Sequence, residues 1–429
     1  MSPRLLLLAS LALGLISFDA SAQRRPAPAN APKAAAPTIA PVVYTGATVH
    51  TGAGAILSDV TVVVAAGKIQ AIGKSAVAPP GSETLSARGM IITPGLVDAL
   101  TSVGLVEVDL EESTRDDHRS GSDLIRAGFR AADGYNPAST VIGVTRAEGV
   151  TSVGVMPTGG LVSGLSAWAD LDGAIASEAI AAAPLALHVH LGAHAAGGHA
   201  TAILRAREAF DDARSFQKNR AAYERNQARR FAPSRLDLEA LTLALGGKVP
   251  VVFHVDRAAD ILSALALAAD FELRPVIAGG AEAWKVARAL SAAKVPVILN
   301  PLAQPGSFDA LGAREDAAAR LFAAGVPVAI STFDTHNARK LRQLAGNAVR
   351  SGLPHEAALA AITRIPAEAL GLGARYGTLA PGKVANLVVW SGDPFEISSR
   401  VMDVMIRGKR VSLRNRQTAL FDRYKTITR

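Results

Sequence analysis

Short apolar runs alternate with longer Ala- and Leu-rich stretches between residues 90 and 376, and this alternation limits the folds open to the chain. The runs have the length of buried strands, and the stretches have the length of helices. Repeated strand–helix units of this size predict a parallel sheet, and their number favours a closed eight-stranded barrel. An open, doubly wound sheet is the alternative, but no Gly-x-Gly-x-x-Gly turn follows any run. The predicted strands include residues 151–156, 185–191, 249–255, 274–278, 295–299 and 326–330, and the predicted helices include 258–269 and 281–292.

Short β-type segments on either side of this region predict a second, smaller domain. On the N-terminal side, residues 42–44, 48–49, 60–64 and 68–72 are separated by glycines, and Ala66-Gly67-Lys68 is typical of a hairpin turn. On the C-terminal side, residues 387–390 and 401–411 have the same character. We expect residues 42–92 and 377–415 to form one small composite β-sandwich, with the barrel between them at 93–376.

The first 41 residues are predicted to lie outside both domains. Arg4, an apolar run at 5–16 and the small residues Ala20-Ser21-Ala22 are typical of a signal peptide at 1–22, and an uncleaved anchor is the alternative. Residues 23–41 are rich in Ala and Pro and predict a linker. No later segment has about 18 uninterrupted apolar residues. We therefore expect a protein of the periplasm or the secreted fraction, without membrane contact after cleavage.

The charge pattern disfavours nucleic acid as a partner. The formal net charge is +8, but Lys and Arg are scattered and aromatic residues make up only 5%. The densest basic cluster lies between Arg205 and Arg230, where Asp and Glu interrupt it. This pattern predicts one long, solvated surface helix over residues 202–231.

Five short motifs carry a resemblance to a known family. They are Thr93-Pro94-Gly95-Leu96-Val97-Asp98, Glu148-Gly149-Val150-Thr151-Ser152-Val153, Pro157-Thr158-Gly159-Gly160-Leu161-Val162-Ser163-Gly164, Gly377-Thr378-Leu379-Ala380-Pro381-Gly382-Lys383 and Gly392-Asp393-Pro394. Together they resemble the amidohydrolase superfamily, near its imidazolonepropionase-like and Xaa-Pro-dipeptidase-like branch, over about residues 42 to 412. The resemblance implies an α/β protein with a TIM-like (β/α)8 barrel and a composite β-sandwich. It also implies hydrolysis of dipeptide or non-peptide C–N bonds by one or two divalent metals at the barrel mouth.

Three positions at which the resemblance implies metal ligands carry residues that cannot serve. The first barrel strand normally continues into His-x-His, but here it reads Leu100-Thr101-Ser102. A hydrocarbon cannot coordinate a metal, and a neutral hydroxyl is a poor ligand. Strand six, which would supply another His, offers only Gly279. These departures predict that the binuclear site is largely lost.

Other donors remain near the expected mouth. His188 falls where this branch would place a bridging Lys, and His190 shares its strand face because the two are two residues apart. His254 keeps its place on strand five. On strand eight a strict alignment puts Phe333 at the position of the catalytic Asp, and a one-residue bulge would restore Asp334. His188, His190, His254 and Asp334 therefore predict a relocated mononuclear site, with Asp334 as the catalytic residue.

Two functions stay open at this point. The first is a hydrolase acting on a small molecule through an altered site that holds one divalent ion, such as zinc. The second is a non-catalytic relative without metal, which binds a small ligand, forms a homo-oligomer or pairs with an active paralogous amidohydrolase. His50, His118 and His355 have no partner visible in the sequence.

Overall fold

The computed structural model describes residues 40–118, 121–302 and 306–426. The predicted signal peptide and nearly all of the predicted linker lie outside these residues. Within them, no helix is both long and apolar enough to cross a lipid bilayer.

Strands from both sides of the barrel region join in one mixed sheet of eight strands, in the order β18-β17-β16-β5-β1-β2-β3 with β4 also on β1. Two hairpin turns bring the distant segments together. Ala66-Gly67 and Arg407-Gly408 both have positive φ, as a two-residue hairpin turn requires, and a Cβ on Gly408 would lie 2.7 Å from the Cα of Gly67. The strands are β1 (Val42–His50), β2 (Ile56–Ala65), β3 (Lys68–Gly73), β4 (Glu83–Ser86), β5 (Ile91–Pro94), β16 (Leu387–Trp390), β17 (Val401–Ile406) and β18 (Lys409–Arg410).

The strands between residues 96 and 330 follow a barrel-like order with one antiparallel segment inserted. β6 pairs in parallel with β7, and β11 to β15 form a parallel series. Between them runs one nearly continuous segment, in which β9 pairs with β7 and β8 pairs with β11, both antiparallel. The strands are β6 (Leu96–Thr101), β7 (Val150–Val155), β8 (Val162–Leu165), β9 (Ala167–Asp170), β10 (Ile180–Ala182), β11 (Leu187–His190), β12 (Val251–Val255), β13 (Pro275–Gly279), β14 (Val297–Leu299) and β15 (Val328–Ile330).

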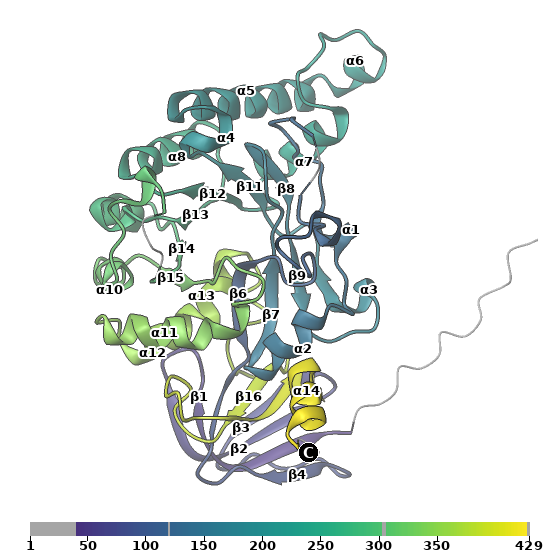
Figure 1. Ribbon diagram of the computed structural model, residues 1–429, viewed down its shortest axis with the longest axis vertical. Helices are drawn as coiled ribbons and strands as arrows, with labels where there is room; N and C mark the ends of the chain where they lie inside the picture. Colours follow the sequence, from purple (N-terminus) through teal and green to yellow (C-terminus); the bar gives the residue numbers. More distant parts are fainter. Residues whose placement is uncertain (1–39, 119–120, 303–305, 427–429) are drawn as a thin grey trace, which may run out of the picture. The chain divides into compact units, whose positions relative to one another are not determined.

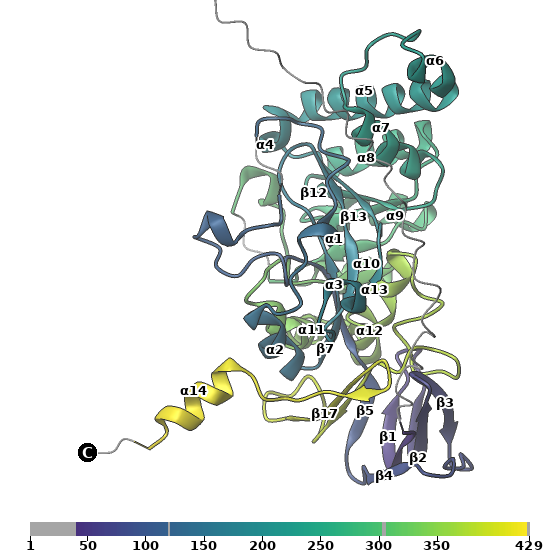
Figure 2. The same ribbon diagram turned by 90° about the vertical axis from the view of Figure 1, so that its right-hand side faces the viewer.

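Helices cover the outside of these strands, and α12 lies beside the mixed sheet in both views (Figures 1 and 2). They are α1 (Ala131–Gly134), α2 (Thr140–Ala147), α3 (Ala176–Ala179), α4 (Ala193–Ala196), α5 (His199–Lys218), α6 (Arg220–Glu224), α7 (Arg235–Leu245), α8 (Ala258–Asp270), α9 (Ala287–Ala292), α10 (Ala317–Ala323), α11 (Leu341–Arg350), α12 (His355–Ala361), α13 (Arg364–Ala369) and α14 (Arg416–Tyr424). Four 3₁₀ turns are η1 (Glu112–Thr114), η2 (Ala283–Val286), η3 (Phe308–Ala310) and η4 (Ala338–Lys340). Figure 2 shows α14 extending away from the mixed sheet.

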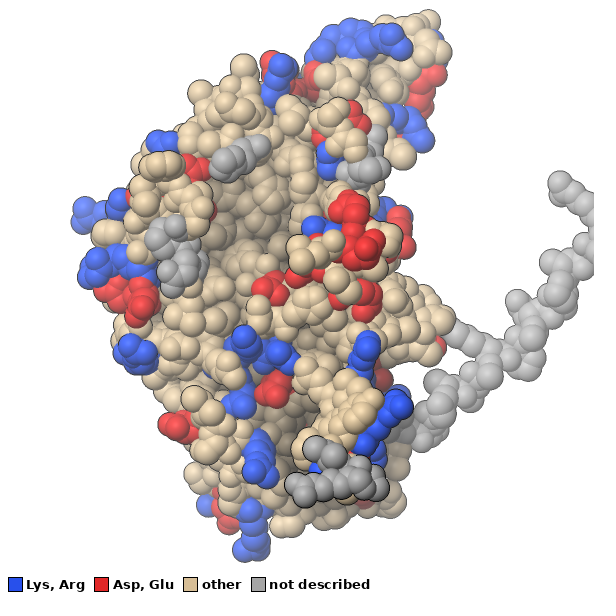
Figure 3. Space-filling model, viewed as in Figure 1, with Lys and Arg blue, Asp and Glu red and all other residues tan. Residues whose placement is uncertain are grey.

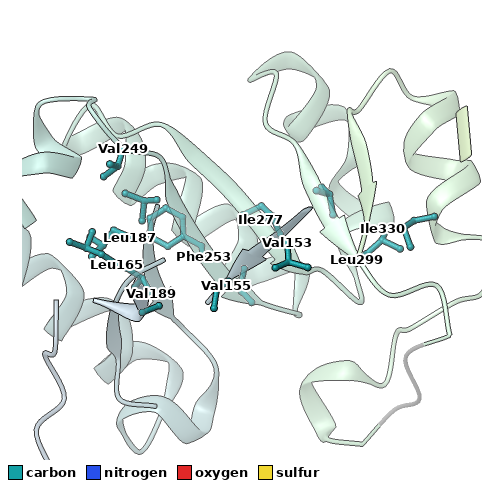
Figure 4. Close-up of a cluster of buried hydrophobic side chains, with 14 of the residues drawn as sticks. Val153, Val155, Leu165, Leu187, Val189, Val249, Phe253, Ile277, Leu299 and Ile330 are labelled. Carbon is teal, nitrogen blue, oxygen red and sulfur yellow. The ribbon is translucent and has the colours of Figure 1, made fainter. Parts of the chain in front are cut away.

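The barrel strands have two buried faces. Leu187, Val189 and Phe253 belong to the cluster that packs under the surrounding helices (Figure 4). Val97, Ala99 and Leu100 on β6 belong to a second cluster with Trp168, Val252 and Ala278. Because side chains alternate along a strand, His188 and His254 must project to the face opposite Leu187 and Phe253. The imidazoles therefore project to the same face as Val252 and Ala278.

In the described part of the chain, β6 and β15, the first and last strands of this order, are joined by side-chain hydrogen bonds and not by backbone pairing. Asp98 on β6 is fully buried and accepts hydrogen bonds from Ser331 Oγ, Thr332 Oγ1 and the Thr332 amide, the last at 3.1 Å. Ser331 Oγ also accepts from the Leu100 amide at 3.0 Å. Burial raises the pKa of Asp98 to about 6, although these hydrogen bonds oppose the shift.

The predicted single helix over residues 202–231 is wrong in extent. α5 begins earlier, at His199, and ends at Lys218, and the short α6 follows. Asn219 separates them because its ψ of 24° leaves the helical range, while its amide bonds back to Ser215 and Phe216. Residues 225–231 are not helical. The next helix, α7, begins only after Ser234, whose side chain forms a capping box with Asp237.

We predict that Asp98→Asn changes the pH dependence of stability. The folded pKa of about 6 lies above the value near 3.9 of an unfolded Asp, so the folded state holds the proton more tightly. The stability due to Asp98 is therefore complete below pH 4 and is lost as the pH rises through 6. Relative to the variant, wild type should lose about 2–3 kcal/mol of unfolding free energy between pH 4 and pH 7. Urea unfolding at four pH values measures this, and parallel profiles for the two proteins contradict it.

Candidate functional site

A cleft of about 430 Å³ opens where the barrel strands β11, β12 and β13 end. Loops after β7, β11 and β14 complete its wall. In the space-filling view, the face turned to the viewer has a hollow with acidic side chains at its rim (Figure 3). The cleft is lined by Gly159, Gly160, His190, Gly192, Ala195, His254, Val255, Asp256, Ala278, Gly279, Ser307, Asp309 and Phe333.

The three histidines predicted on β11 and β12 do lie together. His188 Nδ1 is 2.9 Å from His254 Nε2, so one of these nitrogens donates to the other. The rings of His190 and His254 stack, with centroids 4.1 Å apart and planes at 10°. His188 Nε2 and His190 Nε2 are buried and have no hydrogen-bond partner among the described residues. The cluster therefore keeps two nitrogens unsatisfied.

Removal from bulk water keeps these imidazoles neutral. Burial lowers the pKa of His188 to about 3 and that of His190 to about 4, and it holds the pKa of His254 well below its usual value. A positive charge on His190 would lower the pKa of His188 and His254 further. At neutral pH each ring therefore offers one N–H donor and one lone pair.

Asp256 and Asp309 add carboxylates to the same cleft. Asp256 Oδ1 accepts from the Ala281 amide at 3.1 Å, and Asp309 Oδ2 accepts from the Ala193 amide at 3.3 Å. Burial, together with the charge of Asp309, raises the pKa of Asp256. Neither Asp256 nor Asp309 was among the candidate site residues predicted from the sequence. Asp309 follows a loop without any motif, so no sequence signal marks it.

The three predicted degenerate positions lie in different local environments. Leu100 is 1% exposed and belongs to the inner apolar cluster. Ser102 is also buried, and its carbonyl accepts from the amides of Leu105 and Val106, which begins a turn. Gly279 has a φ of +86°, and a Cβ there would lie 2.7 Å from Asp256 Oδ1. A side chain at position 279 would therefore have an unfavourable backbone conformation and would also clash with the Asp256 carboxylate.

Phe333 and Asp334 take opposite directions at the end of β15. Phe333 lines the cleft and has a φ of +55°, which is unusual for an aromatic residue. The Asp334 carboxylate accepts from the Asn337 amide at 2.9 Å and from Asn337 Nδ2 at 2.8 Å, and the Asp334 carbonyl accepts from Thr101 Oγ1 at 2.6 Å. Asp334 thus closes the turn before η4. Its catalytic role stays a prediction.

A binuclear metal centre does not fit these donors as they are arranged. A bound ion needs lone pairs that converge at about 2 Å from one point. Here His188 and His254 bond to each other, and His190 stacks on His254 instead of converging with it. Among the described residues, three donor atoms lie within 4.8 Å of one another only at His50, His355 and Glu356, away from the cleft.

A sequence profile described as the amidohydrolase family matches residues 178–411. Among curated proteins, amidohydrolase tasK of Hapsidospora irregularis is 27% identical over 379 residues, which is 77% of this chain and 37% of that protein. The imidazolonepropionase of Chromobacterium violaceum is 45% identical over 87 residues, which is 19% of this chain and 21% of that protein. The chain thus spans little more than a third of the first relative and about a fifth of the second.

Solved structures show the same kinship. An amidohydrolase from Thermotoga maritima MSB8 superposes with a TM-score of 0.80 and 28% identity, over 87% of this chain and 100% of that one. A molinate hydrolase superposes with a TM-score of 0.56 and 16% identity, over 88% of this chain and 95% of that one, a likeness of fold alone. The resemblance stated from the sequence motifs is confirmed, and the expected TIM-like barrel fold is supported.

We predict that Gly279→Ala destabilises the protein through contact with Asp256. The substitution should lower the unfolding free energy by about 2–4 kcal/mol, because it adds a steric conflict to the backbone penalty. Gly247→Ala is the matched control, since Gly247 also has positive φ but has no atom within 4 Å of the added Cβ. It should cost only about 1 kcal/mol. In an Asp256→Ala background the two substitutions should cost the same, and an unchanged difference between them contradicts the assignment.

Proposed function

This chain belongs to the amidohydrolase family, and from that premise we propose that it is an exported member whose barrel mouth binds a small molecule without the binuclear metal centre. Binding, and not metal-dependent hydrolysis, is then the role of the cleft. Membership of the family supports the TIM-like barrel and a hydrolase-like protein. The loss of the centre, the ligand and the export are our proposal.

The observation that carries this proposal is the nature of the three substituted positions. Leu100 is part of the apolar interior, Ser102 begins a turn, and Gly279 has a backbone that other residues resist. The side chains allowed at Leu100 and Gly279 are therefore restricted by their neighbours. The cleft therefore persists as a stable cavity that does not need an ion to hold its walls.

The chemistry of the lining favours a ligand that is rich in N–H groups. A cleft of about 430 Å³ suits a small molecule. His190 offers an unpartnered Nε2, while Asp256 and Asp309 offer acceptor oxygens. Phe333 and Val255 supply an apolar wall. Dipeptides and cyclic amides, neutral or cationic, match this set of groups.

One observation favours a second candidate, hydrolysis through a relocated mononuclear site. His188 Nε2 and His190 Nε2 are both buried without partners, and a reoriented His254 would add a third nitrogen. Asp334 would act as the base after leaving Asn337. This route needs two side-chain rearrangements, so we rank it below binding.

Export is proposed from the N-terminal pattern alone. Arg4, the apolar run at 5–16 and Ala20-Ser21-Ala22 have the order of a cleavable signal. N-terminal sequencing of the protein recovered from an expressing bacterium tests it. A mature start at Gln23 in the periplasmic fraction is the expected result, and a cytoplasmic protein with an intact start contradicts it.

We predict that dipeptides or cyclic amides bind the cleft and are not turned over. The purified mature protein should gain thermal stability with its ligands, while release of amine stays at background with or without added Zn²⁺, Mn²⁺ or Fe²⁺. His190→Gln should weaken binding about tenfold, because it removes one hydrogen bond worth about 1.4 kcal/mol. Calorimetric titration measures the dissociation constant.

His118→Gln is the matched control, since His118 pairs with Asp117 and Glu112 outside the cleft lining. It should leave binding unchanged. Metal-dependent turnover that disappears in His254→Gln would overturn the proposal and support the second candidate.

A further inference from the structure

A second group of histidines and carboxylates lies at the junction of the mixed sheet and the barrel. His50 is the last residue of β1, and His355 and Glu356 begin α12. Asp393 follows β16, in the Gly392-Asp393-Pro394 motif. We propose that His50, His355 and Glu356 form a binding site for one divalent transition-metal ion, with Zn²⁺ as the ion they fit best. This site is independent of the function proposed for the cleft.

The donor atoms have the spacing of a metal site. His50 Nδ1 is 2.7 Å from Glu356 Oε1, and His355 Nδ1 is 3.3 Å from the same oxygen. The three donors all lie within 4.8 Å of one another. Ligands bound to zinc at about 2.1 Å stand about 3.4 Å apart in a tetrahedron, so small side-chain movements suffice. Two imidazoles and one carboxylate are also a ligand set that zinc accepts in proteins.

Asp393 orients one of the imidazoles for this role. Its two oxygens lie 3.0 and 2.9 Å from His355 Nε2. A carboxylate only accepts, so His355 Nε2 carries the proton and, in the neutral ring, Nδ1 carries the lone pair. The Phe395 amide donates to Asp393 Oδ1 at 2.8 Å and holds the carboxylate in place. A carboxylate on the far nitrogen of a ligating histidine is the common outer partner in zinc sites.

Two features of the Glu356 carboxylate favour a positive charge beside it. His355 Nδ1 and Glu356 Oε1 face each other at 3.3 Å, and in the neutral ring both are acceptors. Glu356 Oε2 is buried and has no hydrogen-bond partner among the described residues. A metal ion answers both features at once, because it binds the His355 lone pair and one or both Glu356 oxygens. A proton on His355 answers only the first.

The three side chains are partly exposed, so an ion can reach them from solvent, and partly buried, so they can retain it. The side chains of His50, Glu356 and His355 are 10%, 26% and 33% exposed. Three protein ligands leave one position for water. Since His50 and Glu356 are 306 residues apart in the chain, a bound ion would tie the mixed sheet to α12.

Metal titration of the mature protein tests the site. After chelation and dialysis, wild type should bind one equivalent of Zn²⁺, with a melting temperature about 3 °C higher when free Zn²⁺ is 100-fold above the dissociation constant. His50→Gln and His355→Gln should each weaken binding at least 100-fold. Asp393→Asn should weaken it about 10- to 100-fold, as loss of an outer partner does. Co²⁺ in place of Zn²⁺ should give visible absorption in wild type that His355→Gln removes.

Two controls separate this site from others. His118→Gln removes another carboxylate-paired imidazole and should leave Zn²⁺ binding unchanged. His190→Gln in the cleft should do the same. If His50→Gln does not fold, Glu356→Gln replaces it as the test.

Each contrary outcome has a distinct meaning. No Zn²⁺ binding by wild type, or binding that both His50→Gln and His355→Gln keep, overturns the junction site and leaves the proposed function standing. Binding lost in His190→Gln and kept in His355→Gln places the ion in the cleft and overturns both.

Discussion

The buried carboxylate of Asp98 holds the first barrel strand against the last, and the geometry of the mouth depends on this contact. No backbone ladder joins β6 to β15 in the described residues, so Ser331 and Thr332 must supply the hydrogen bonds. These hydrogen bonds set the register between β6 and β15, and with it the positions of the residues that follow each strand. Beyond this contact, Thr101 Oγ1 donates to the Asp334 carbonyl, the Asp334 side chain accepts from Asn337 Nδ2, and Phe333 lines the cleft.

The two histidine groups of this protein differ in which buried atoms lack a hydrogen-bond partner among the described residues: imidazole nitrogens in the barrel, and a carboxylate oxygen at the junction. In the barrel, His188 and His254 satisfy each other, and burial keeps the rings neutral. Water or a small ligand can supply hydrogen bonds to the two nitrogens that remain, Nε2 of His188 and Nε2 of His190. At the junction, two imidazoles meet a carboxylate that keeps one oxygen buried and unpaired. His50 Nδ1 reaches one oxygen of this carboxylate at 2.7 Å, whereas the other oxygen has no donor among the described residues, and a cation would satisfy it.

The sequence predicted the repeated strands well because apolar runs mark buried strands directly. The run at 249–255 contains β12, and the run at 274–278 overlaps β13. The antiparallel segment β8–β9 was missed because Gly159 and Gly160 precede it and suggested a loop. His188 and His190 were linked because a two-residue spacing reports a shared strand face, and His254 was added from its place in the family resemblance. The pairing of His50 with Glu356 has no such local signature, since only the folded junction brings these residues together.

The three predicted degenerate positions lie in three different local environments, and the proposed loss of the metal centre depends on them. Leu100 packs in the apolar interior, the Ser102 carbonyl begins a turn, and Gly279 has a backbone conformation that other residues resist. No single substitution reverses all three, because each is supported by different neighbours. Asp98 and the apolar interior hold the strands together at the mouth. An ion at the junction would act on a different element, the contact of β1 with α12, where the chain relies on two histidines and two carboxylates to join segments that are far apart in sequence.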